Sequence, residues 1–171
     1  MTFDPALVYC ARGAVALLFL VAAATKIVDF VRFRVVLAGY GIPEHATAAL
    51  GAAVIAMELV AGAGAVVGLD QPLYMAGGLL AGYAIAMAVG LVNGRRADCG
   101  CSLRAQPTSW ALVIRNVALL PVVALALGSP AERALGVFDY VSIAGGIVVA
   151  ALVYLTANEL IAARDRMEEW I

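Results

Sequence analysis

The chain has 171 residues, of which 64% are hydrophobic and 13% are charged, and its mean hydropathy is +0.98. About half of the residues of a soluble globular domain are apolar and about a quarter are charged, so this composition excludes that class. The formal net charge of −1 gives no information about partners, and no basic cluster is dense enough to indicate nucleic acid, so we expect no nucleic-acid partner.

Five apolar blocks of about 20 residues predict helices that can cross a hydrocarbon core of roughly 30 Å. Their small and aliphatic side chains favour close helix–helix contact in lipid. The expected fold class is therefore all-α: a polytopic membrane helix bundle of four to five transmembrane helices, folded as a single integral-membrane domain over residues 1–171. The predicted spans are residues 8–25, 46–69, 72–92, 110–127 and 137–157.

The first block is expected to be an uncleaved span and not a signal peptide. A signal peptide carries its positive charge before the apolar stretch, whereas here Asp4 precedes the block and Arg12 lies inside it. After this block, residues 26–37 mix three cations with bulky apolar side chains. That mixture predicts a short helix at the membrane interface.

Ionisable side chains inside a span are costly, so each one is a candidate site. Glu58 lies near the middle of the second span, Arg12 one turn inside the first, and Arg115 with Asn116 a little over one turn inside the fourth. Lys26 completes this set of structural or proton-linked candidates. We expect Glu58 to be buried, either ion-paired with Arg12 or protonated, where it fixes helix register. The alternative is a proton acceptor coupled to thiol chemistry or to a bound quinone.

The longest polar break, between the third and fourth spans, contains Asp98-Cys99-Gly100-Cys101. Two cysteines one residue apart are too few for a closed zinc site, but they suit thiol–disulfide exchange, because the ring they form is small and strained. Nearby arginines lower a thiol pKa and so raise its reactivity. Cys99 and Cys101 are therefore the candidate catalytic pair. Capture of a soft metal such as Cu(I), and two loop thiols without a task, are the alternatives. We expect no cofactor and no metal centre.

The cations of the predicted loops are distributed unevenly between the two sides of the membrane. One side holds most of them, whereas the other holds Arg133, with Arg12 just inside the first span. The positive-inside rule therefore predicts an external amino terminus and a cytoplasmic Cys-Gly-Cys loop and tail. The cations on the predicted cytoplasmic side are Lys26, Arg32, Arg34, Arg95, Arg96, Arg104, Arg164 and Arg166.

Several separated motifs carry a family resemblance and together cover most of the chain up to about residue 120. They are Arg12 with the small-residue run to Thr25-Lys26, Tyr40-Gly41-Ile42-Pro43, Glu58-Leu59-Val60-Ala61-Gly62, Asp98-Cys99-Gly100-Cys101, Ser109-Trp110 and Arg115-Asn116. With these motifs the sequence resembles the MauE family of methylamine-utilisation membrane proteins, within the wider DoxX-like group. The family usually has Phe-Gly after the second cysteine, where this chain has Ser102-Leu103.

The resemblance implies a multi-pass protein of the bacterial inner membrane that assists disulfide formation or maturation of a partner. MauE-type proteins are implicated in maturing methylamine dehydrogenase, whose small subunit is exported and rich in disulfides. By analogy Cys99 and Cys101 would exchange disulfides, similar in role to membrane proteins of the DsbD type. The implied partners are the lipid bilayer and another membrane or exported protein. The alternatives are a non-catalytic accessory or scaffold subunit of a larger membrane complex, and a quinone, lipid or soft-metal binder.

Overall fold

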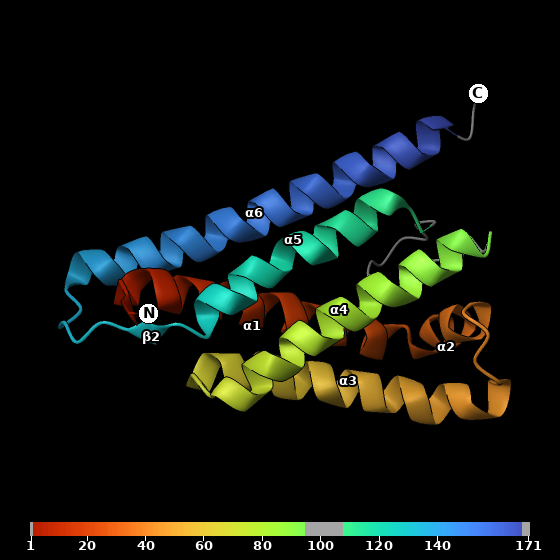
Figure 1. The fold of residues 1–171 in the computed structure, drawn as a ribbon, viewed down its shortest axis with the longest axis horizontal. Helices are drawn as coiled ribbons and strands as arrows, with labels where there is room; N and C mark the ends of the chain where they lie inside the picture. The colour runs from red at the N-terminus through yellow and green to blue at the C-terminus, as the bar shows by residue number, and fades with distance from the viewer. Residues whose placement is uncertain (1, 95–107, 169–171) are drawn as a thin grey trace.

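The computed structural model describes residues 2–94 and 108–168, and its ribbon is a bundle of long helices (Figure 1). This architecture confirms the predicted all-α membrane bundle. One short parallel strand pair joins the two chain segments that precede α1 and follow α5. The elements are β1 (Thr2–Phe3), α1 (Pro5–Val28), α2 (Phe30–Gly39), α3 (Glu44–Val67), α4 (Asp70–Val92), α5 (Trp110–Ala126), β2 (Ser129–Pro130) and α6 (Val137–Glu168).

Among the described residues, four helices are long and apolar enough to cross a membrane: α1, α3, α4 and the Val137–Arg164 part of α6. Helix α5 is apolar but has 17 residues. At 1.5 Å per residue it is roughly 26 Å long, slightly less than a typical hydrocarbon core. The short helix α2 lies where the sequence predicts one. The chain is therefore a multi-pass membrane protein.

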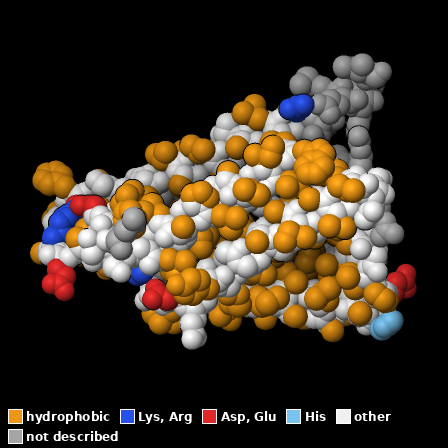
Figure 2. Space-filling model, in the orientation of Figure 1, with side chains coloured by type: hydrophobic (Ala, Val, Ile, Leu, Met, Phe, Trp, Pro, Cys, Tyr) orange, Lys and Arg blue, Asp and Glu red, His pale blue; other side chains and the backbone are white. Residues whose placement is uncertain are grey.

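The long helices run back and forth between two ends of the bundle (Figure 1). One end holds the amino terminus, the α3–α4 turn and β2. The other holds α2, the end of α4 and the start of α5, and we call it the α2 end. On the face that Figure 2 shows, hydrophobic side chains cover the middle, and charged groups gather at the ends. This banding is the surface that a bilayer requires, because charge is costly at hydrocarbon depth.

Glycines let the helices of the core approach one another closely. A Cβ on Gly62 of α3 would lie 2.8 Å from Leu20 Cγ of α1, and one on Gly64 would overlap with Pro72 of α4. Side chains such as Phe19 and Leu73 fill the space that remains. Packing of this kind holds helices together in lipid, where burial of apolar surface gives little driving force.

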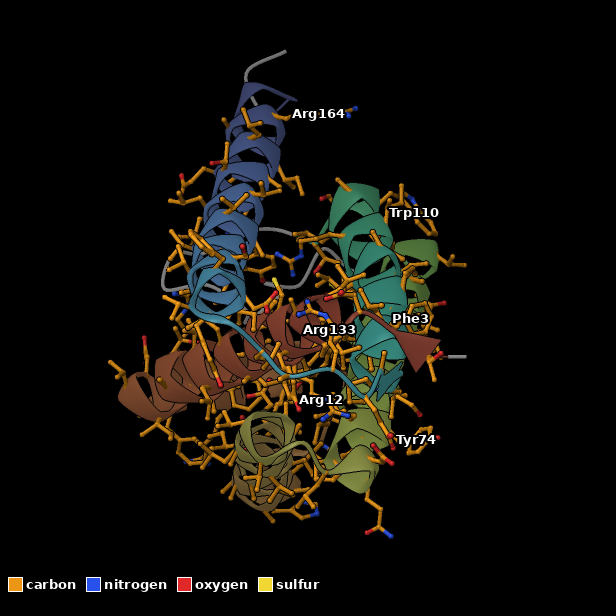
Figure 3. The ribbon with its side chains drawn as sticks, turned by 90° about the vertical axis from the view of Figure 1, so that its left-hand side faces the viewer. Phe3, Arg12, Tyr74, Trp110, Arg133 and Arg164 are labelled. Carbon is orange, nitrogen blue, oxygen red and sulfur yellow. The ribbon has the colours of Figure 1, made fainter. Side chains whose placement is uncertain are left out.

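Helix α6 lies at the edge of the bundle and packs mainly on α1. At their crossing, Ile147 fills the space above Gly13, and Cys10 of α1 lies against Gly146. None of the apolar window of α6 is buried. In end view, α6 stands apart from α5 (Figure 3).

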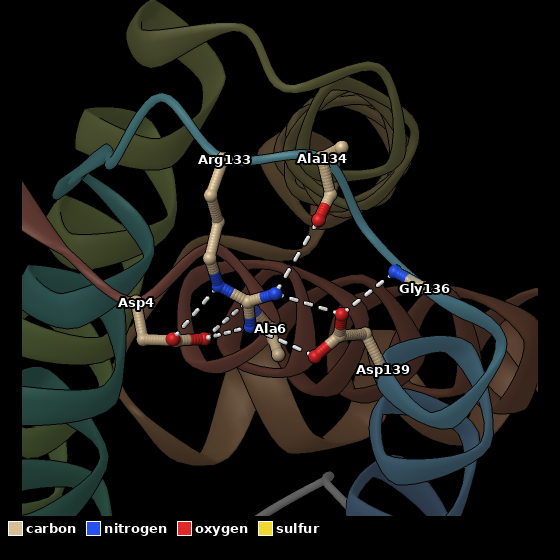
Figure 4. Close-up of polar contacts among 6 residues, drawn as sticks. All are labelled: Asp4, Ala6, Arg133, Ala134, Gly136 and Asp139. Atoms are coloured by element: carbon tan, nitrogen blue, oxygen red, sulfur yellow. Dashed lines mark hydrogen bonds and ion pairs between the residues drawn. The ribbon is translucent and has the colours of Figure 1, made fainter.

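A charged clasp at the amino-terminal end ties the start of the chain to the α5–α6 connection. Arg133 Nη2 donates to Asp4 Oδ1 at 3.0 Å and to Asp139 Oδ1 at 2.8 Å (Figure 4). The hydrogen bond from Arg133, followed by that from the Ala6 amide, lowers the pKa of Asp4 below its ordinary 3.8. The clasp is therefore fully formed when the pH is above 3.8, and it is lost as the pH falls through the lowered pKa of Asp4. Because these groups are exposed, their net contribution to stability is small.

Arg12 secures the same end from inside the bundle (Figure 3). Its Nε donates to the Ala126 carbonyl of α5 at 2.9 Å, and its Nη2 lies 3.9 Å from Asp70 Oδ1. The guanidinium packs on Gly68, which ends α3 in the left-handed conformation with φ 79°. A side chain at this position would both strain the backbone and meet Arg12.

We therefore expect Gly68→Ala to lower the free energy of unfolding by about 1–2 kcal/mol, the cost of left-handed backbone for a residue with a Cβ. Gly78→Ala is the matched control, because a Cβ on Gly78 of α4 would meet nothing within 4 Å. Thermal unfolding of both purified variants in detergent measures the difference. Equal unfolding temperatures for the two would contradict this account of the α3–α4 turn.

Candidate functional site

The predicted pair Cys99 and Cys101 lies outside the described residues. The chain leaves α4 through Asn93 and Gly94, and the description resumes at Thr108, just before α5. Both flanks lie at the α2 end (Figure 1). The Thr108 hydroxyl is 3.1 Å from the Tyr40 hydroxyl, so the segment just before α5 is tied to the end of α2.

A buried ion pair joins α1 to α3 beneath this end. Lys26 Nζ donates to Glu58 Oε1 at 2.7 Å, and the two side chains are 3% and 0% exposed. Burying either charge by itself would cost several kcal/mol, so each makes the other tolerable at this depth. The pair is electrically neutral as a whole, and it fixes the register of α1 against α3.

Tyr83 brings α4 into the same cluster. Its hydroxyl donates to Glu58 Oε1 at 2.6 Å, and the Lys26 ammonium lies 5.6 Å from the centre of its ring and 5.4 Å from that of Phe33 on α2. Aromatic faces attract a desolvated ammonium. The Lys26 ammonium and the Tyr83 hydroxyl both donate to Glu58 Oε1, whereas Glu58 Oε2 is buried and has no hydrogen-bond partner among the described residues. The cluster thus joins four helices and leaves one carboxylate oxygen of Glu58 without a donor.

The Glu58–Arg12 ion pair expected from the sequence does not form. Arg12 lies at the other end of the bundle, against Ala126 and Asp70, because α1 and α3 run in opposite directions. In the register where Gly62 meets Leu20, Glu58 faces the last turn of α1, and Lys26 lies there. Lys26 is also part of helix α1 and not of the loop that follows the first predicted span.

Tyr83 was not singled out from the sequence as a site residue. Its signal is a phenol hydroxyl in the middle of an apolar span, whereas Tyr74 lies near the start of that span. A buried phenol needs a hydrogen-bond partner, and in an apolar span that partner has to come from another helix. Glu58 supplies it here.

Arg115 and Asn116 lie on α5 and do not join the Lys26–Glu58–Tyr83 cluster. Arg115 is 9% exposed and donates through Nη1 to Asn158 Oδ1 of α6 at 2.5 Å. Its guanidinium carbon lies 5.2 Å from the centre of the Tyr154 ring. Asn116 is 3% exposed, and its Nδ2 has no acceptor. The five candidate residues inside the helices therefore belong to three separate places.

Among the described residues, no three His, Cys, Asp or Glu side chains gather closely enough to hold a metal ion. Cys10, the free cysteine within that part of the chain, packs against Gly146. The chemistry that the described side chains offer is ion pairing and hydrogen bonding inside a membrane. The other two cysteines lie in the sequence between Gly94 and Thr108, outside the described residues.

Comparison with known proteins gives two matches. The family model described as "Methylamine utilisation protein MauE" matches residues 4–129. The protein named "Methylamine utilization protein MauE" from Paracoccus denitrificans is 31% identical over 164 residues, which is 92% of this chain and 88% of that protein. No solved structure matches the chain.

Removing one member of the buried pair should cost more than removing both. We expect Lys26→Met and Glu58→Gln each to lower the free energy of unfolding by about 3–5 kcal/mol, because each leaves the charge of the other residue buried without its partner. The double variant should recover most of that loss, because the glutamine amide introduced at position 58 keeps an oxygen for the Tyr83 hydroxyl. Chemical or thermal unfolding in detergent provides the double-mutant cycle. Additive losses would show that the two side chains are not coupled.

Proposed function

Because the chain belongs to the MauE family of methylamine-utilisation membrane proteins, we propose that it matures a partner protein by thiol–disulfide exchange through Cys99 and Cys101. The observation that carries this proposal is the Cys-Gly-Cys sequence, which connects two helices of a membrane bundle. Such a pair forms a strained disulfide, which is readily exchanged and poorly suited to stabilisation.

The exchange conserves atoms and electrons. A thiolate of the partner attacks the Cys99–Cys101 disulfide and forms a mixed disulfide, and one cysteine of the pair leaves as a thiolate. The partner's second thiolate then resolves the mixed disulfide. The partner ends with a disulfide, and Cys99 and Cys101 end as two thiols, so two electrons have passed to this protein. The reverse direction uses the same steps and reduces the partner.

Contacts among the described residues hold the two helices that the Cys-Gly-Cys sequence connects. The helices on both sides of the stretch, α4 and α5, pack closely along their length. The Tyr40–Thr108 contact ties the segment before α5 to the end of α2, and Tyr83 ties α4 to Glu58 of α3. A pair carried between two helices that are held in this way meets a partner from a defined direction, which favours exchange over random oxidation.

We propose the bacterial inner membrane as the location, since the relative is a bacterial protein of the same family. The distribution of cations among the loops predicts that the Cys-Gly-Cys sequence lies on the cytoplasmic side. A partner on the far side would then require a second membrane protein to relay the electrons. The partner is another membrane protein or an exported one.

Serine substitutions test the thiol chemistry. We expect Cys99→Ser and Cys101→Ser each to abolish maturation of the partner, and one of them to trap the mixed disulfide, visible as a reducible adduct on non-reducing gels. Cys10→Ser is the matched control and should retain activity, because Cys10 packs against Gly146 of α6. Full maturation by the double Cys99→Ser/Cys101→Ser variant would refute the exchange role and favour a scaffold subunit.

Labelling tests the side of the membrane. In a Cys10→Ser background, a membrane-impermeant maleimide should label Cys99 and Cys101 after the cells are permeabilised and not before, as the charge distribution predicts. A thiol engineered near Arg133, at the opposite end of the bundle, should show the reverse pattern. Labelling of Cys99 and Cys101 in intact cells would place them on the outer face.

A further inference from the structure

Arg115 is a buried cation whose charge the described residues do not balance. It is 9% exposed, and its polar partner, the Asn158 amide oxygen, is neutral. The remaining close contact is with the Tyr154 ring. Within the described residues no carboxylate lies at ion-pair distance, in contrast to Lys26, which has Glu58. An arginine cannot shed its proton, so the charge persists at this depth.

The guanidinium keeps an unused donor of defined geometry. Nη1 is engaged by Asn158, and the Tyr154 ring stacks near the guanidinium plane. Nε, on the edge away from Nη1, is buried and has no acceptor in the part of the chain that the structure describes. A buried donor left unsatisfied costs about 1–3 kcal/mol, more when it is charged. An oxyanion that accepts a hydrogen bond from Arg115 Nε would therefore satisfy this donor and balance the charge of the guanidinium.

The start of α5 holds two further polar groups that lack a hydrogen-bond partner among the described residues. They are the buried Nδ2 of Asn116, the next residue, and the buried Ser109 hydroxyl. Ser109 also makes no side-chain cap hydrogen bond at the start of α5. The first two turns of α5 thus combine a cation, spare donors and the positive end of the helix dipole, all of which favour an anion.

The depth of Arg115 indicates where the anion comes from. Trp110, at the start of α5, is 55% exposed, and exposed tryptophans mark the headgroup level of a bilayer. Arg115 lies five residues further along, roughly 7.5 Å deeper at 1.5 Å per residue. An arginine side chain at this depth reaches back to the level of lipid phosphates.

Arg115 is buried where α5 and α6 meet, and this junction lies at the edge of the bundle. Within the described residues α6 packs mainly on α1 and makes few contacts with α5, and none of its apolar window is buried (Figures 1 and 3). The Arg115–Asn158 contact bridges the two helices. A phosphodiester that enters this junction from the membrane offers two oxygens that match the side-on edge of a guanidinium.

We propose that Arg115 binds the phosphodiester of a phospholipid headgroup between α5 and α6, with Asn116 as a neighbouring donor. The bound phosphate balances the buried charge and links α6 to the rest of the bundle through Arg115 and Asn158. The proposal uses neither Cys99 nor Cys101, so it stands or fails independently of the proposed function.

The test measures lipid-dependent stabilisation of the full chain in detergent. Phosphatidylglycerol should raise the unfolding temperature of the wild-type protein, and native mass spectrometry should show one retained phospholipid. Arg115→Gln should weaken the apparent affinity for phosphatidylglycerol at least tenfold, and Arg115→Lys should fall between, since it keeps the charge but loses the side-on edge. Arg34→Gln, which removes an exposed cation of α2, is the matched control and should bind as the wild type does.

Three outcomes would overturn the proposal. Equal stabilisation of wild type and Arg115→Gln by phosphatidylglycerol would exclude Arg115 as the binding group. Equal stabilisation of the wild type by diacylglycerol, which lacks the phosphate, would show that apolar contact suffices. Stabilisation by inorganic phosphate at the same concentration would show a site for a free anion and not for a lipid. Because the readout is the increment caused by lipid, a change in the baseline stability of a variant does not obscure it.

Discussion

The ion pair between Lys26 and Glu58 is the interaction on which the arrangement of α1, α3 and α4 depends. Both charges are buried, and each is tolerable at that depth because the other is 2.7 Å away. Tyr83 adds a third helix through its hydrogen bond to the same carboxylate oxygen. Apolar side chains slide past one another at little cost in lipid, whereas this cluster has one favourable register.

The rest of the bundle is consistent with that register. Gly62 admits Leu20 four residues beyond Glu58, and Gly68 admits the guanidinium of Arg12 at the far end of the same helix pair. Arg12 in turn holds the carbonyl of Ala126, which positions the end of α5. The polar contacts at the two ends and the small residues between them thus specify the same antiparallel arrangement of α1 and α3.

The functional features concentrate at the α2 end. The chain segments that flank the Cys-Gly-Cys sequence lie there, tied by Tyr40 to Thr108, and the Lys26–Glu58 pair lies beneath. Arg115 lies one to two turns inside the start of α5, on the side toward α6. This end of the molecule therefore combines the two segments that flank the Cys-Gly-Cys sequence with two buried cations, one of which is balanced by a carboxylate.

The sequence by itself determined the class of fold, the approximate limits of the helices and the family, because apolar blocks of membrane-spanning length and short polar motifs are local properties. It also indicated which side chains carry the cost of burial, Glu58 and Arg115 among them. The partners of those side chains were decided by tertiary structure. Lys26 and not Arg12 neutralises Glu58, since the antiparallel register sets which turns of α1 and α3 meet, and Asn158 reaches Arg115 from 43 residues away. Such pairings depend on how helices pack in three dimensions, which no local pattern in one sequence records.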